Sequence, residues 1–184
     1  NFNMMFSQRG VMNLAHNEHD IKEMKRRISA NRLNGLDTQW VDTKQIKELV
    51  PIMNTENLRY PVLGAAFQPR GGVARHDAVA WGYALRSNEM GVDIIQNCEV
   101  KDIKTDNHKV EGVNTSKGFI RANKVAVVAS GHTSVLAQTA GVRLPLQSRP
   151  LQALVSEPIK PVINTVVMSN AVHAYVSQSD KGEL

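Results

Sequence analysis

The histidines are the residues best suited to chemistry in this chain, and His76 has the most unusual position. It lies in the stretch "GGVARHDAVAW" (71–81), directly after Arg75 and where a helix should begin. Ser, Thr, Asp and Asn are the preferred helix caps, so capping does not explain a histidine here. An imidazole can act as a nucleophile, a general base or a ligand. Considered by helix-start chemistry alone, the simpler interpretation is a tolerated surface histidine, with Asp77 as the cap.

Other candidate motifs are weaker. His16 and His19 are three residues apart, but no cysteine or carboxylate cluster completes a metal site at a familiar spacing, and we expect no metal. His132 follows Gly131 at the end of an apolar stretch, a place where α/β folds bind ligands. Cys98 is the only cysteine and is typical of a small core residue. The 12 glycines form neither a G-x-G-x-x-G pattern nor a P-loop.

The composition is that of an ordinary soluble globular protein, with 42% hydrophobic and 21% charged residues in 184. The net charge of +5 permits contact with anions. Because the basic residues are spread along the chain, we expect no nucleic-acid binding. No apolar run approaches the roughly 18 residues of a membrane helix. With a single cysteine and no signal peptide, we expect a cytoplasmic protein that does not bind membranes.

The first 70 residues predict strands and two helices. Residues 4–15 suit one or two short strands around Gly10. An amphipathic helix is predicted within 17–35, with Gly35 beyond its end. Its apolar positions recur at spacings of three and four: Ile21, Met24 and Ile28.

The second of these helices has a clear start signal. Asp42 and Gln45 have the spacing of a capping box, and Pro51 should stop the helix. Residues 59–70 are punctuated by Pro and Gly and should be extended.

The segment 71–141 predicts an α/β portion. A helix over 77–90, closed by Gly91, leads into alternating segments that should form an antiparallel meander. "KVAVVA" (124–129) predicts a strand that is apolar on both faces, as in a layered sheet. A further helix should end at Gly141.

The remainder, 142–184, is strand-like, with candidate strands at 151–157, 165–170 and 173–179. The chain is therefore α+β with one α/β portion, and its two flanking pieces are candidates to pair into another sheet. Neither end has the pattern of a natural terminus, so we expect a piece of a longer polypeptide.

The chain resembles the D-amino-acid-oxidase-like family of FAD-dependent oxidoreductases. The family pattern is a glycine-rich entry, a helix ending in "GV", a strand carrying a valine, a hairpin, and an apolar strand ending in Ala-(Ala/Ser)-Gly. Within the family, the resemblance is strongest to the beta subunits of heterotetrameric enzymes that oxidise sarcosine. The matching stretches are "FSQRGVMNLAH", "YPVLGAAFQPRGGVARHDAVAW", "NEMGVDIIQNCEV", "LPLQSRPLQALVSEP" and "VVMSNAVHAYVSQSDKGEL".

This resemblance implies a fold and domain limits. Residues 71–141 would be part of a glutathione-reductase-like FAD-binding domain. Residues 1–70 and 142–184 would be part of an antiparallel-sheet substrate domain, and both domains would be incomplete. The G-x-G-x-x-G strand–helix start and an active-site lysine of the family are absent from this chain, so we expect the isolated chain to be inactive. Loss of flavin from the isolated chain, and self-association through its uncovered surfaces, are further expectations.

The resemblance also implies an activity, cofactors and partners. Such enzymes oxidise sarcosine to glycine on a noncovalent FAD, and electrons pass through a covalent FMN to oxygen, which gives hydrogen peroxide. The FMN lies between the beta and alpha subunits of a hetero-oligomer. Two alternatives stay open: another amine such as dimethylglycine or a D-amino acid as substrate, and a non-catalytic interaction module. No catalytic residue can be assigned from the chain.

Site residues follow from the same resemblance. His76 matches the histidine that carries FMN; relatives often have another histidine two residues later, where this chain has Ala78. Attachment at the flavin 8α-methyl needs a neutral imidazole, and a helix N-terminus disfavours the cationic form. The positive charge of Arg75 would also disfavour the cationic form of His76. Arg75 could in addition neutralise the FMN phosphate or the negative charge of a reduced ring.

Further positions match the FAD site. Val100 corresponds to the valine whose backbone pairs with adenine. The alternative is that Val100 is an ordinary core residue of a strand. The strand end that lines FAD corresponds to three consecutive residues: Ala129, Ser130 and Gly131.

Overall fold

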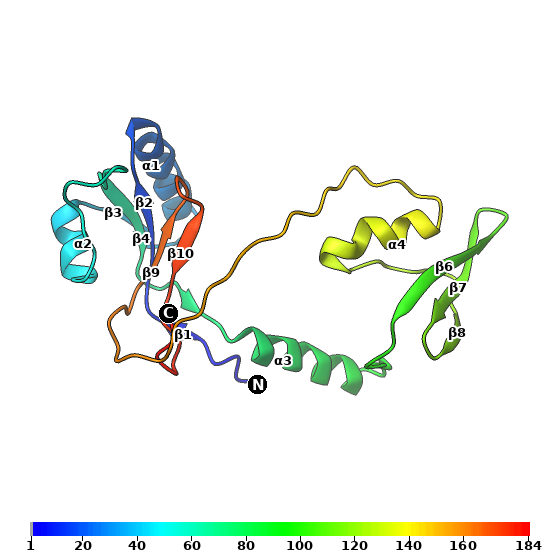
Figure 1. Cartoon of the computed structure of the whole chain (residues 1–184). Coiled ribbons are helices and arrows are strands. Elements are labelled where there is room, and N and C mark those ends of the chain that lie inside the picture. The colour runs from blue at the N-terminus through cyan, green and yellow to red at the C-terminus, as the bar shows by residue number, and fades with distance from the viewer. Residues whose placement is uncertain (1) are drawn as a thin grey trace. The chain divides into compact units, whose positions relative to one another are not determined.

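The computed structural model describes residues 2–184, which form two compact units. The first comprises the chain up to Ser87 together with Leu154–Leu184, and the second is Asn88–Ala153. Figure 1 traces the elements of both. None of the helices in this described part is long and apolar enough to cross a membrane.

A five-stranded sheet organises the first unit, in the order β10-β9-β2-β4-β3. Its strands are β2 (Val11–Ala15), β3 (Gln39–Val41), β4 (Gly64–Gln68), β9 (Val166–Ser169) and β10 (Ala174–Val176). The β2–β9 pair is parallel and the other pairs are antiparallel. The predicted pairing of residues 1–70 with residues 142–184 is confirmed, because β2 of the first piece pairs with β9 of the second (Figure 1).

Two helices cover opposite faces of this sheet. Side chains alternate between faces along a strand, so Leu14 and Ala15 point in opposite directions. Leu14 belongs to a core cluster with Ile46 of α2 (Thr43–Leu49), and Ala15 to a cluster with Met24 of α1 (Glu18–Leu33). The sheet is therefore covered by α2 on one face and by α1 on the other.

The caps of these helices agree with the sequence. Asn17 accepts a hydrogen bond from the N–H of Asp20 at the start of α1, and Gly35 beyond its end has φ +78°. At α2, the Asp42 carboxylate accepts the N–H of Gln45 at 2.8 Å, and the Gln45 side chain accepts the N–H of Asp42 at 3.0 Å. The predicted capping box is confirmed.

Asp42→Ala should lower the free energy of unfolding by about 1 kcal/mol, because it leaves the N–H of Gln45 without its partner. Denaturant unfolding of the complete protein measures this. Glu48→Ala, at an exposed position of the same helix, is the matched control and should have little effect. Equal stability of the two variants would contradict a role for the cap.

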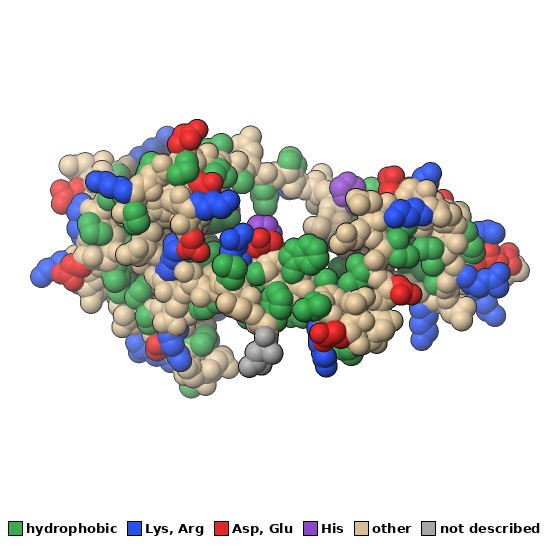
Figure 2. Space-filling model, turned by 90° about the horizontal axis from the view of Figure 1, so that it is seen from below, with side chains coloured by type: hydrophobic (Ala, Val, Ile, Leu, Met, Phe, Trp, Pro, Cys, Tyr) green, Lys and Arg blue, Asp and Glu red, His purple; other side chains and the backbone are tan. Residues whose placement is uncertain are grey.

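A short arm leads out of the sheet toward the predicted site. β1 (Ser7–Gln8) pairs with β5 (Gly72–Val73), and α3 (His76–Glu89) follows directly. None of the described residues of α3 is buried, and Trp81 and Tyr83 are 62% and 75% exposed. Apolar side chains also appear at the surface in Figure 2, in green.

The second unit contains the predicted meander. β6 (Val100–Asp106), β7 (Lys109–Thr115) and β8 (Gly118–Arg121) form an antiparallel sheet in that order. A turn, η1 (Ser130–His132), leads into α4 (Thr133–Thr139), which packs against β6. Thr139 accepts the N–H of Ile103 at 3.0 Å, and Gly141 follows the helix with φ +75°.

Three predicted strands are wrong or shorter than predicted. Residues 124–129 form no strand, and Val128 is 93% exposed. A strand that is apolar on both faces needs neighbours for its hydrogen bonds, and residues 2–184 contain no strand that pairs with this one. Residues 151–157 likewise form no strand and are exposed, and the first strand of the meander begins only at Val100, nine residues after Gly91.

The contact boundaries differ from the predicted domain limits. The division falls after Ser87 and before Leu154, whereas the family pattern suggested limits at 70/71 and 141/142. The assignment of these segments to FAD-binding and substrate domains stays a prediction.

Candidate functional site

His76 is the first residue of α3, as its predicted place at a helix start requires. The carbonyl of Arg75 accepts the N–H of Val79 at 3.0 Å, so Arg75 occupies the N-cap position. The predicted cap, Asp77, lies instead in the first turn, where its carboxylate accepts the N–H of Ala78 at 2.8 Å. The His76 side chain is exposed, which leaves its ring accessible from solvent.

Arg75 and Asp77 form a two-pronged ion pair. The guanidinium donates from Nη2 at 2.8 Å and from Nε at 3.2 Å to the two carboxylate oxygens. The hydrogen bond from Arg75, together with that from Ala78, holds the pKa of Asp77 below its usual 3.8. The same hydrogen bond raises the pKa of Arg75. The charge of Arg75 is thus compensated next to His76, and its proposed contact with a cofactor stays a prediction.

Asp77 should titrate below pH 3.8, and Arg75→Gln should move its pKa up toward that value. Because the folded-state pKa is depressed, the contribution of the ionised carboxylate is present above the usual pKa and is lost as the pH falls through the folded-state value. Carboxyl-carbon NMR titration measures the shift. Arg26→Gln, on the exposed face of α1, should leave Asp77 unchanged; an unchanged Asp77 in Arg75→Gln would contradict the pairing.

The arm before His76 depends on two glycines. The carbonyl of Gly71 accepts the N–H groups of Arg9 and Gly10 at 3.1 and 2.9 Å. A Cβ on Gly72 would overlap the carbonyl oxygen of Ser7. Glycine at this position therefore allows the β1 and β5 backbones to approach closely, which places the chain that enters α3.

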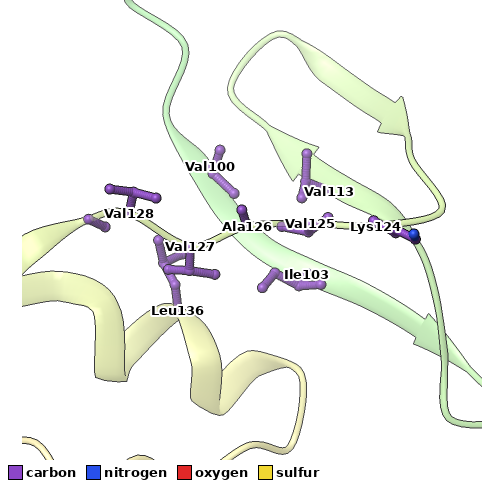
Figure 3. Close-up of a pocket in the computed structure, with 10 residues that line it drawn as sticks. Val100, Ile103, Val113, Lys124, Val125, Ala126, Val127, Val128 and Leu136 are labelled. Atoms are coloured by element: carbon purple, nitrogen blue, oxygen red, sulfur yellow. The ribbon is translucent and has the colours of Figure 1, made fainter.

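In the second unit, two of the four predicted FAD-site residues line an apolar cavity of about 370 Å³. Val100 lines it from the start of β6 and Ala129 from the end of the 124–129 segment. Figure 3 shows Val100, Ile103 and Val113 on the meander side and Leu136 on α4. Residues of four separate segments thus meet at one cavity, and two of them, Val100 and Ala129, are candidates from the sequence.

A second cavity, of about 450 Å³, adjoins the first and has a more polar lining. Val100 and Leu136 line both cavities, and here Glu99, Lys101 and His132 join them. The register shifts between Val100 and Asp102, so the β6–β7 pairing is irregular at this point. β6 is an edge strand of its sheet, and edge strands present backbone groups that no neighbouring strand takes up.

Ser130 and Gly131 lie in the η1 turn beside these cavities rather than at a strand end. Ser130 has φ +48°, a left-handed conformation that is uncommon for a residue with a side chain. The carbonyl of Gly131 accepts a hydrogen bond from the Ser148 hydroxyl at 2.5 Å. The turn is therefore held in place by Ser148, which sequence reasoning did not identify because it lies 17 residues away.

A family comparison decides the membership of the chain. The model of the FAD dependent oxidoreductase (DAO) family matches residues 1–184. The chain belongs to this family of FAD dependent oxidoreductases.

Curated relatives and solved structures agree with this result. The chain is 57% identical to sarcosine oxidase subunit beta of an Arthrobacter species and 55% identical to that of Rhodobacter capsulatus, over its whole length. It covers 45% and 44% of those relatives, and so spans less than half of their length. L-proline dehydrogenase from P. horikoshii matches 97% of the chain and 48% of that protein, at a TM-score of 0.80 and 26% identity.

The fold prediction is confirmed by these neighbours. Glycine oxidase from Bacillus cereus, at 19% identity, matches 99% of this chain and 48% of that one with a TM-score of 0.71, which shows a shared fold. The chain combines helices with several separate sheets. This arrangement is consistent with a partial FAD-binding fold and an additional sheet.

Proposed function

We propose that the chain is part of the beta subunit of a flavin-dependent sarcosine oxidase, which demethylates sarcosine oxidatively to glycine. The observation that carries this proposal is the 50–57% identity to three sarcosine oxidase beta subunits over all 184 residues. Electrons would pass from FAD through FMN to oxygen, with hydrogen peroxide as product. Because the chain spans less than half of those relatives, we expect activity only from the complete polypeptide with its partner subunits.

Noncovalent FAD is supported by the family and by the residues of the second unit. The apolar lining of the 370 Å³ cavity suits a flat aromatic ring such as adenine. Val100 lies at the start of an edge strand, where backbone groups are able to pair with ring nitrogens. Ala129, Ser130 and Gly131 would line the cofactor with small side chains. A bound flavin supplies the two-electron acceptor that amino-acid side chains lack.

Covalent FMN at His76 is supported by the exposure of the ring and by its place at the start of α3. The imidazole nitrogen would form a C–N bond to the 8α-methyl carbon and replace one of its hydrogens. The N–H and C–H hydrogens would leave as protons, and the electron pair of the broken C–H bond would pass to dioxygen as the oxidant. Asp77 balances Arg75 beside this site and so limits the net charge there.

Partners follow from the same relatives, whose names mark them as subunits. We propose association with an alpha subunit and further subunits, and a small-molecule amine as substrate. Trp81 and Tyr83 of α3 are exposed, as expected for a surface that a partner subunit covers in the assembly. In the isolated chain, the same surface would drive self-association.

His76→Ala should abolish flavin that stays with the denatured chain, because it removes the attachment atom. The complete protein is denatured, separated on a gel and inspected for flavin fluorescence, and the mass of the intact chain is measured. His19→Ala, at an exposed position of α1, is the matched control and should retain the covalent flavin. Wild-type protein that loses all flavin on denaturation would contradict attachment at His76.

Sarcosine should be oxidised with the highest kcat/KM among sarcosine, dimethylglycine and D-alanine, and hydrogen peroxide should form in step with the amine consumed. Oxygen uptake and a peroxide assay measure both. A preference for dimethylglycine or D-alanine would contradict sarcosine as the substrate and would still agree with flavin-dependent amine oxidation. Purified complete protein without FAD or oxidase activity would favour a non-catalytic interaction module.

A further inference from the structure

Arg9 connects two segments that are distant in the sequence. Its N–H donates to the carbonyl of Gly71, at the start of the arm that leads to His76. Its guanidinium donates to the carbonyl of Gln178 at 2.6 Å and forms an ion pair with Asp180. The side chain is only 23% exposed. We call this set of contacts the Arg9 clamp.

The far side of the clamp is rigidly built. Gln178 is 5% exposed, and its side-chain amide bonds to the backbone on both sides. It accepts from the N–H groups of Val162 and Ile163 and donates to the carbonyls of Ile159, Lys160 and Gly182. A buried amide with several satisfied hydrogen bonds holds one conformation. The carbonyl that receives Arg9 is therefore fixed in place.

The near side of the clamp ends at His76. β1 and β5 pair at Ser7–Val73 and Gln8–Gly72, so Arg9 directly follows the paired segment. The absence of room for a Cβ on Gly72 leaves the arm little freedom to slide along β1. Only two residues separate β5 from His76.

The charges alternate across this region. Arg9 pairs with Asp180, and Arg75 pairs with Asp77. The pKa of Arg75 is raised first by its hydrogen bond to Asp77 and then by the charges of Asp77 and Asp180. Asp180 makes its ion pair with Arg9 and has only the smallest of these effects on Arg75.

We propose that Arg9 is a positioning residue for His76: it clamps the Gly71–Asp77 arm to the 178–180 turn and so holds the imidazole for flavin attachment. This inference rests on the proposed function of His76. Bond formation requires the reacting atoms to be held at close range, and a misplacement of about 1 Å can cost on the order of 100-fold in rate. An arginine fork suits the task because it reaches a carbonyl and a carboxylate at once.

The experiment compares Arg9→Gln, Asp180→Asn and Asp180→Glu in the complete protein produced with its partner subunits. Covalent flavin per chain is followed over time after FMN is added to flavin-depleted protein. Arg9→Gln and Asp180→Asn should attach FMN about tenfold more slowly, since they loosen but do not remove the arm. Asp180→Glu should restore most of the rate, because it keeps the carboxylate. Arg26→Gln on α1 is the matched control and should match the wild type.

Two further measurements separate positioning from general damage. The noncovalent FAD content and the thermal midpoint should stay at the wild-type values, while hydrogen exchange in the 69–76 region should become faster in Arg9→Gln. Wild-type attachment rates in both Arg9→Gln and Asp180→Asn would overturn the clamp, as would a parallel loss of FAD and thermal stability. If wild-type protein carries no covalent flavin, attachment at His76 itself fails; unchanged hydrogen exchange in Arg9→Gln would then reject the clamp independently.

Discussion

The parallel pairing of β2 with β9 is the constraint on which the first unit depends. Met12 lies opposite Val167 on one side and Phe67 on the other, so β2 has a hydrogen-bonded neighbour along each edge. Parallel neighbours cannot be joined by a tight turn, and here residues 16–165 separate them. The sheet therefore closes only when distant parts of the chain meet. Once β2 is enclosed, Met12 becomes fully buried and α1 and α2 can cover the two faces.

The same sheet directs the chain toward His76. β4 ends at Gln68, the chain turns through Gly71, and the short β1–β5 pair carries it into α3. Nothing in the local chemistry of "ARHDAV" is unusual for a helix start except the histidine. What distinguishes the site is that the chain entering it is tied to two other segments, through Arg9 on one side and the 178–180 turn on the other.

The cavity of the second unit is lined mainly by apolar side chains, from β6, β7, the 124–129 segment and α4. Its larger apolar surfaces belong to a sheet edge and to an extended segment that pairs with no strand among residues 2–184. This explains why the predicted strand at 124–129 is exposed while its neighbouring meander is regular. The meander makes its hydrogen bonds within residues 100–121, whereas a central strand depends on partners from elsewhere.

The sequence by itself determined the local structure. The capping box at Asp42 and Gln45, the terminating glycines at 35 and 141, and the meander turns all depend on contacts within a few residues, and all are present. It also determined the family, through long motifs that include His76 and Val100. Only the tertiary structure decided that Val100 and Ala129 share a cavity and that Arg9 meets Gln178 and Asp180. Those contacts join residues whose spacing carries no local period, since they form only after the β2–β9 pairing and the packing of α4 bring the segments together.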